Sequence, residues 1–144
     1  MALMEMGVRT LTNRLPKVIG PKTHAIIDYG MAASFILTGV LLLKKSKRGA
    51  IASFICGANE ITTAMLTDYP GGVAKVISFP THGKIDAGFA GVIASMPNLM
   101  GFSDRGFSSF FRAQGLAMAA VTGLTDFEGE RESERSRRGF RRVA

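Results

Sequence analysis

Four apolar segments of similar length dominate this chain of 144 residues. They cover residues 25–43, 49–67, 82–102 and 107–124, and turn-forming or charged residues separate them. Each segment has roughly 18 to 21 residues. A helix of that length, rising about 1.5 Å per residue, crosses the hydrocarbon core of a bilayer. The pattern therefore predicts an all-α fold, an integral membrane four-helix bundle.

The interiors of these segments lack the polar stripe that helices of a soluble bundle show. Residues 32–43 contain only Ser34 and Thr38 as polar residues, and both side chains can bond to their own helix. Small residues recur at 88–91 and 117–120, which is typical of helices packed closely in lipid. Ionisable residues within the segments and the absence of Trp keep a soluble four-helix bundle as the alternative.

The chain aligns with itself at an offset of 58 residues. The segment THAIIDYG at 23–30 matches THGKIDAG at 81–88, and LTDY at 66–69 matches LTDF at 124–127. Both the start and the end of a two-helix unit recur, so the sequence predicts two tandem repeats, which are parallel because each crosses the membrane twice. We expect an amphipathic or disordered lead-in (1–20), a first two-helix repeat (21–70), a linker (71–80), a second two-helix repeat (81–127) and a charged mobile tail (128–144).

Parallel repeats bring a set of repeated ionisable residues to one face of the membrane. In each repeat a His and an Asp lie four residues apart, so they share one helical face. The candidate ligand- or proton-binding residues of this face are His24, Asp28, His82, Asp86, Asp68 and Asp126.

Two interpretations of these residues are open. In the first, Thr23 and Thr81 cap the helices, and the His-Asp pairs only fasten neighbouring helix ends. In the second, His24 and His82 bind a metal ion or exchange protons, and the aspartates orient them. No cofactor is predicted from this pattern, although a metal ion is compatible with it.

Glu60 is the one acid deep inside a predicted segment, and Met118 occupies its position in the second repeat. A carboxylate within a membrane is a functional candidate, through proton binding or a partner charge. Arg112 and Gln114 are its nearest partners by depth. The alternative is a protonated Glu60 that bonds to a backbone carbonyl or to Asn59.

Charge and cysteine content exclude several classes of protein. The net charge of +7 does not predict nucleic-acid binding, because the basic residues flank apolar segments and do not alternate with aromatic residues. The single Cys56 excludes a disulfide framework and is expected to be a packing residue. The first residues lack the apolar core of a secretory signal. Basic residues are about twice as numerous on the side of the termini, which predicts cytoplasmic termini in a bacterial inner membrane.

Residues 75–86 (KVISFPTHGKID) and 94–102 (ASMPNLMGF) resemble the bacterial SPW-repeat family of small membrane proteins. The resemblance covers about residues 21–127. The Ser-Pro-Trp signature is degraded, because Ser95 is retained, Pro97 is shifted by one position and Asn98 replaces the Trp. The resemblance implies paired two-helix units and a membrane location, but no activity.

Three functions remain, in this order. The first is a structural or assembly subunit that contacts the lipid bilayer and other membrane proteins or further copies of itself. The second is proton or metal binding or transfer at the His-Asp site on one membrane face. The third is a membrane enzyme, which would need a placed nucleophile or a metal-bound water.

Overall fold

The computed structural model describes residues 15–102 and 104–129. Its helices are α2 (Pro21–Leu42), α3 (Lys47–Leu66), α4 (Phe79–Leu99) and α5 (Arg105–Leu124), and its two short strands are β1 (Thr67–Asp68) and β2 (Ile77–Ser78). The all-α fold class is thereby confirmed. Most of the predicted lead-in (1–14) and of the predicted tail (130–144) lies outside the described residues.

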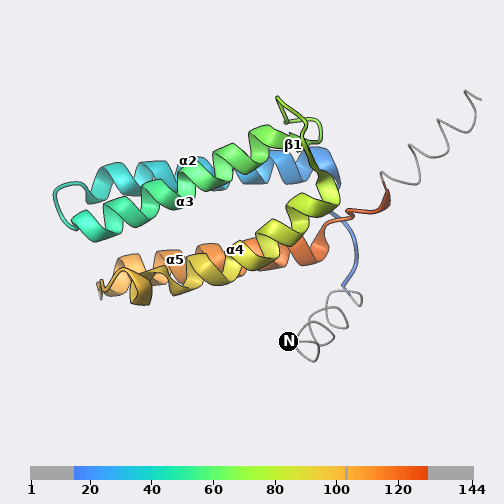
Figure 1. The fold of residues 1–144 in the computed structure, drawn as a ribbon. Helices are drawn as coiled ribbons and strands as arrows, with labels where there is room; N and C mark the ends of the chain where they lie inside the picture. Colours follow the sequence, from blue (N-terminus) through green and yellow to red (C-terminus); the bar gives the residue numbers. More distant parts are fainter. Residues whose placement is uncertain (1–14, 103, 130–144) are drawn as a thin grey trace, which may run out of the picture.

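The helices form two hairpins that lie side by side (Figure 1). Helix α2 packs mainly against α3, and α4 packs mainly against α5. Strands β1 and β2 pair in parallel between the hairpins, with Thr67 opposite Ile77. The equivalent pairing 58 residues away joins Ile19 to Thr125. Both ends of the described chain therefore lie at the same end of the bundle as β1.

Prolines in the first turn set the starts of α2 and α4. Pro21 and Pro80 occupy first-turn positions, where a missing N–H has no cost. Helix α2 begins after Gly20, which provides no side-chain cap, and α4 is capped by Ser78, whose hydroxyl accepts from the backbone N–H of Thr81. The prediction that Thr23 and Thr81 cap these helices is therefore wrong, because each helix begins before its threonine.

Close contact within each hairpin depends on a glycine. A Cβ atom on Gly115 of α5 would lie 2.6 Å from the carbonyl oxygen of Ala90 in α4. Gly57 in α3 is the equivalent glycine of the first hairpin. A Cβ atom on Gly57 would lie 3.3 Å from the carbonyl oxygen of Ala32 in α2. Small residues at such crossings let helix backbones approach each other closely.

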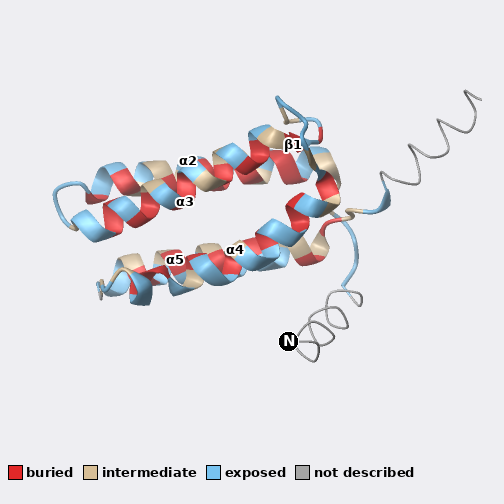
Figure 2. Cartoon of the chain, in the orientation of Figure 1, coloured by how far each residue is buried: buried red, intermediate tan, exposed pale blue. Residues whose placement is uncertain are grey.

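The main apolar core lies between the two hairpins. It includes Phe35, Ile93 and Phe111, all fully buried, and Cys56, which confirms the prediction that this cysteine is a packing residue. Figure 2 shows buried residues along the facing sides of the helices and exposed residues along the outer sides.

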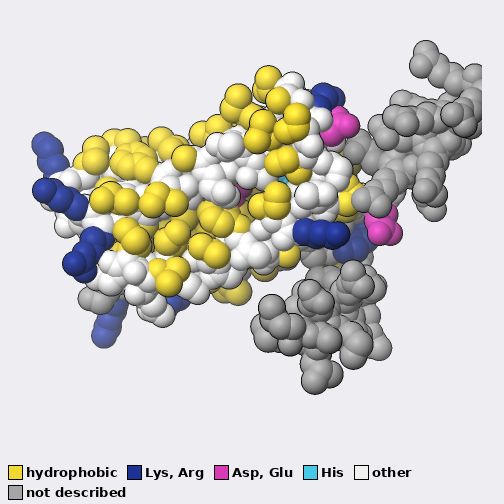
Figure 3. All heavy atoms as spheres, in the orientation of Figure 1, with side chains coloured by type: hydrophobic (Ala, Val, Ile, Leu, Met, Phe, Trp, Pro, Cys, Tyr) yellow, Lys and Arg dark blue, Asp and Glu magenta, His cyan; other side chains and the backbone are white. Residues whose placement is uncertain are grey.

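The outer sides of the bundle are themselves strongly apolar. Ile26, Leu37 and Leu41 of α2 are 65%, 61% and 63% exposed, and Leu116 of α5 is 72% exposed. Figure 3 shows this apolar surface between an end rich in Lys and Arg and the opposite end, where acidic residues also appear. By length and composition, α2 and α3 are able to cross a membrane. Four crossings remain a prediction.

Candidate metal centre

The two repeated His-Asp pairs meet in the interior of the bundle. His24 and Asp28 come from the start of α2, and His82 and Asp86 come from the start of α4. Both imidazoles are fully buried, and both aspartates are 4% exposed. Each residue offers one ligand atom, and these four atoms all lie within 4.8 Å of one another. The group is therefore a buried site that could hold a metal ion.

Each imidazole contacts both carboxylates through its Nε2 atom. Within the helices, Nε2 of His24 lies 3.4 Å from Asp28, and Nε2 of His82 lies 3.0 Å from Asp86. Across the helices, the His24–Asp86 and His82–Asp28 distances are 3.1 and 3.3 Å. The sequence predicts the two pairs within helices, because they follow from spacing. The two pairs across helices form only because the starts of α2 and α4 meet in the folded bundle.

Several of the separations between these atoms are close to the edge of a tetrahedron around a small divalent ion. Ligand atoms at about 2.0–2.1 Å from a tetrahedral ion lie about 3.3–3.4 Å from each other. The two Nε2 atoms are 3.3 Å apart. Their distances to the carboxylate oxygens range from 3.0 to 3.4 Å. One ion bound by all four residues would draw the carboxylates closer together, because the four ligand atoms span up to 4.8 Å and the two contacts of Asp28 use different oxygens, Oδ1 and Oδ2.

Two threonines fix the tautomer of the histidines. The hydroxyl of Thr67 donates to the carbonyl oxygen of Thr63 at 2.6 Å, so it accepts from Nδ1–H of His82, which lies 2.7 Å away. The hydroxyl of Thr125 donates to Val121 at 2.6 Å and accepts from Nδ1–H of His24 at 2.8 Å. With the proton held on Nδ1, the lone pair of a neutral imidazole is on Nε2, toward the centre of the site.

The charge of the site requires a positive partner. With both imidazoles neutral, the two carboxylates leave an uncompensated negative charge in the interior, which is very costly. Among residues 15–102 and 104–129, the only Lys or Arg ion pair is that of Lys75 with Asp68, at 3.3 Å. Protons on both Nε2 atoms would balance the charge, with carboxylate oxygens 3.0 to 3.4 Å away to accept them. One divalent cation in place of these protons would balance it equally.

Aromatic rings enclose the imidazoles. The rings of Phe79 and Phe127 lie 5.3 and 5.4 Å from that of His24, and the ring of Tyr69 lies 5.5 Å from that of His82. The hydroxyl of Tyr69 donates to Oδ2 of Asp28 at 2.8 Å. Burial and the negative charge of Asp28 raise the pKa of Tyr69 above its usual range, so the phenol keeps its proton. Phe127 is its repeat equivalent and has no hydroxyl.

Asp68 and Asp126 lie at the same end of the bundle but do not join the cluster. The side chain of Asp68 is 54% exposed and pairs with Lys75. Asp126 accepts from the backbone N–H of Gly129 at 2.8 Å. The threonine before each aspartate has extended backbone, and successive side chains of extended backbone point to opposite sides. The threonines therefore reach the histidines and the aspartates point outward.

Sequence reasoning missed Thr67, Thr125 and Tyr69 as residues of the site. All three belong to the repeated LTDY and LTDF segments. The repeat therefore indicated these positions, but in each segment the sequence analysis assigned the ionisable aspartate to the site instead of its neighbours.

Glu60 is 2% exposed, and its Oε1 atom has no hydrogen-bond partner among the described residues. The two residues predicted as partners of Glu60 make other contacts or face solvent. Gln114 donates to the hydroxyl of Ser34 at 2.9 Å, and Arg112 is exposed beside a groove between α4 and α5. The predicted pairing of Glu60 with these residues is therefore wrong.

Comparisons with protein-family models, with curated proteins and with solved structures found no match to this chain. The likeness to the SPW-repeat family accordingly stays a prediction, and the site is interpreted from its own geometry.

Proposed function

We propose that this chain is a small membrane protein whose two hairpins are fastened together by one divalent metal ion, bound by His24, Asp28, His82 and Asp86. The proposal combines a structural role in the membrane with metal binding. The observation that carries it is the meeting of four buried ligand groups, whose ligand atoms lie within 4.8 Å of one another, with both Nδ1–H groups already held by threonines.

Zn²⁺ is the first choice among the metals. A ligand set of two imidazole nitrogens and two carboxylate oxygens suits four-coordinate Zn²⁺, whereas Mg²⁺ and Ca²⁺ prefer six or more oxygen ligands. Because α2 and α4 each supply one His and one Asp, the ion would link the first hairpin to the second. Its binding free energy would then be part of the folding free energy.

The ligand set supports a structural ion over a catalytic one. Catalytic zinc sites have three protein ligands and leave a fourth position for water or substrate. Here the protein offers four ligands, and the site is closed from solvent by burial of both histidines. The membrane enzyme is therefore the function with least support from the geometry.

The proposal locates the chain in the bacterial inner membrane, with four crossings and cytoplasmic termini. The apolar outer faces of the helices support a lipid environment, because soluble monomers rarely expose apolar patches of this extent. The turn between α2 and α3 contains Lys44 and Lys45, and α3 begins with Lys47; these basic residues suit the headgroup layer. Recovery of the expressed chain in alkali-washed membranes is expected, and recovery in the soluble fraction would contradict this location.

Metal content tests the site itself. The full chain is purified in detergent, stripped with a chelator and titrated with Zn²⁺ and with Co²⁺. We expect one ion per chain and the visible spectrum of tetrahedral Co²⁺. The Asp86→Asn variant should lose most of this binding, whereas Asp68→Asn, a matched change in an exposed acid at the same end of the bundle, should keep it.

Two results would overturn the proposal. One is the absence of Zn²⁺ and Co²⁺ binding by a wild-type chain whose circular dichroism shows intact helices. The other is equal binding by the Asp86→Asn and Asp68→Asn variants, which would assign the metal to the surface.

A further inference from the structure

A polar groove lies between the end of α4 and the start of α5, in the hairpin end remote from the His-Asp site. Its volume is about 440 Å³, within the range of about 300–1,000 Å³ that is usual for small-molecule sites. The residues that line it are Asn98, Phe102, Arg105, Ser108, Ser109 and Arg112.

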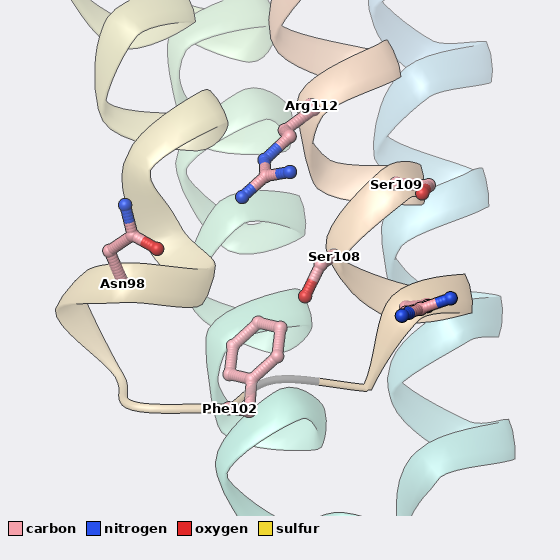
Figure 4. A pocket seen from close by; sticks show the side chains of 6 residues that line it. Asn98, Phe102, Ser108, Ser109 and Arg112 are labelled. Carbon is pink, nitrogen blue, oxygen red and sulfur yellow. The ribbon is translucent and has the colours of Figure 1, made fainter.

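One stripe of α5 provides most of the polar groups. These groups follow one face of the helix, because they lie three, four and seven residues after Arg105. They belong to Ser108, Ser109 and Arg112. Figure 4 shows the guanidinium of Arg112 and the hydroxyl of Ser108 directed from α5 toward the side where Asn98 lies, with the ring of Phe102 below them. Arg112, Ser108 and Asn98 thus border one space, whereas Ser109 is directed away from Asn98 in this view.

The groove carries positive charge without a protein counter-ion. No acid lines it. Within the part of the chain that the structure describes, neither Arg105 nor Arg112 forms a salt bridge. The acid nearest to them in sequence, Asp104, already accepts hydrogen bonds from the backbone N–H groups of residues 106 and 107. Two guanidinium groups therefore remain available to an anion.

We propose that this groove binds a phosphate group. A phosphate presents several acceptor oxygens and matches the planar fork of arginine in a bidentate manner. Two guanidinium groups, the Asn98 amide and the Ser108 hydroxyl together offer more donors than the two oxygens of a carboxylate can use. The same chemistry is supplied by a phospholipid headgroup and by free phosphate or a soluble phosphate ester.

The lipid source rests on the proposed membrane location, but the phosphate chemistry does not. The groove lies at the same end of the bundle as the turn between α2 and α3, since Arg48 of that hairpin donates to the carbonyl oxygen of Gly101 at 3.2 Å. In a bilayer this end, with its basic turn, lies in the headgroup layer. A phospholipid phosphate would then enter the groove from the side.

Binding to the purified full chain in dodecyl maltoside tests the site. The probes are inorganic phosphate and, separately, phosphatidylglycerol in mixed micelles, each titrated by calorimetry. The double variant Arg105→Gln with Arg112→Gln should bind at least roughly tenfold more weakly, because hydrogen bonds to charged groups are lost. The matched control, Lys44→Gln with Lys45→Gln, removes the same charge from the same end outside the groove and should bind nearly as the wild type does.

The outcomes separate the sources and the two proposals. Phosphatidylglycerol binding without phosphate binding assigns a lipid, and binding of inorganic phosphate supports a soluble anion. Binding of neither probe, or equal weakening by both double variants, overturns the site. Arg112→Lys keeps the positive charge but removes the bidentate guanidinium group. Phosphate binding between that of the wild type and that of the double variant is expected, which tests the role of the guanidinium in a folded protein. Zn²⁺ content, measured on the same samples, should be unchanged in every variant, so failure of the metal site would be seen independently.

Discussion

The hydroxyl of Thr67 provides the most direct test of how the metal centre is organised. Thr67→Val keeps the shape of the side chain but removes the acceptor for Nδ1–H of His82, now 2.7 Å away. That N–H would be left without a partner in a fully buried position. Loss of the group that orients a metal-binding histidine commonly costs 10–100-fold in affinity, or about 1.4–2.7 kcal/mol. We therefore expect the Kd for Zn²⁺ to rise by that factor.

The measurement is a competition titration with a chromophoric chelator, made on the full chain in detergent. Thr125→Val should have the same effect, since Thr125 holds His24 by an equivalent bond. The matched control is Thr62→Val, an identical change at an exposed position of α3. Unchanged affinity in Thr67→Val, or an equal loss in Thr62→Val, would refute the assignment of the threonine hydroxyls as orienting groups.

Three further predictions follow from the same contacts. Zn²⁺ affinity should fall as pH is lowered, because protons compete for the Nε2 atoms; a titration that is flat between pH 8 and pH 5 (roughly the range in which histidine titrates) would contradict histidine ligation. Tyr69→Phe removes one hydrogen bond to Asp28, so Zn²⁺ should bind more weakly, by roughly tenfold or less, and tighter binding would contradict this role. Gly115→Ala should destabilise the bundle by about 1–3 kcal/mol, because its Cβ would meet Ala90, whereas Gly88→Ala, with open space around it, should not; thermal unfolding in detergent compares the two.

The sequence predicts the helical architecture and half of the metal centre. Length and apolar character set the four helices, and the offset of 58 residues picks out His24, His82 and their aspartates. The structure brings these four residues together, because parallel hairpins place equivalent helix starts at one end. The prediction that Thr23 begins α2 is wrong, since the helix begins earlier, at a first-turn proline without a capping side chain.

The remainder of the centre depends on backbone direction, which residue type does not reveal. Asp68 and Thr67 are neighbours, and only the extended conformation after α3 decides which of them points inward. The partner of Glu60 likewise depends on how the hairpins are rotated against each other. Helical spacing gives its depth, but not the neighbour at that depth.

The exchange of contacts between the hairpins has a consequence for how the site is assembled. Thr67 of the first hairpin holds His82 of the second, and Thr125 of the second holds His24 of the first. Neither hairpin alone contains both a histidine and the threonine that orients it, so each half of the chain depends on the other. During synthesis, His24 cannot bond to Thr125 until the second hairpin has left the ribosome, because 101 positions separate the two residues. Metal binding would therefore require both hairpins, and two hairpins expressed separately would have to associate before either could hold the ion.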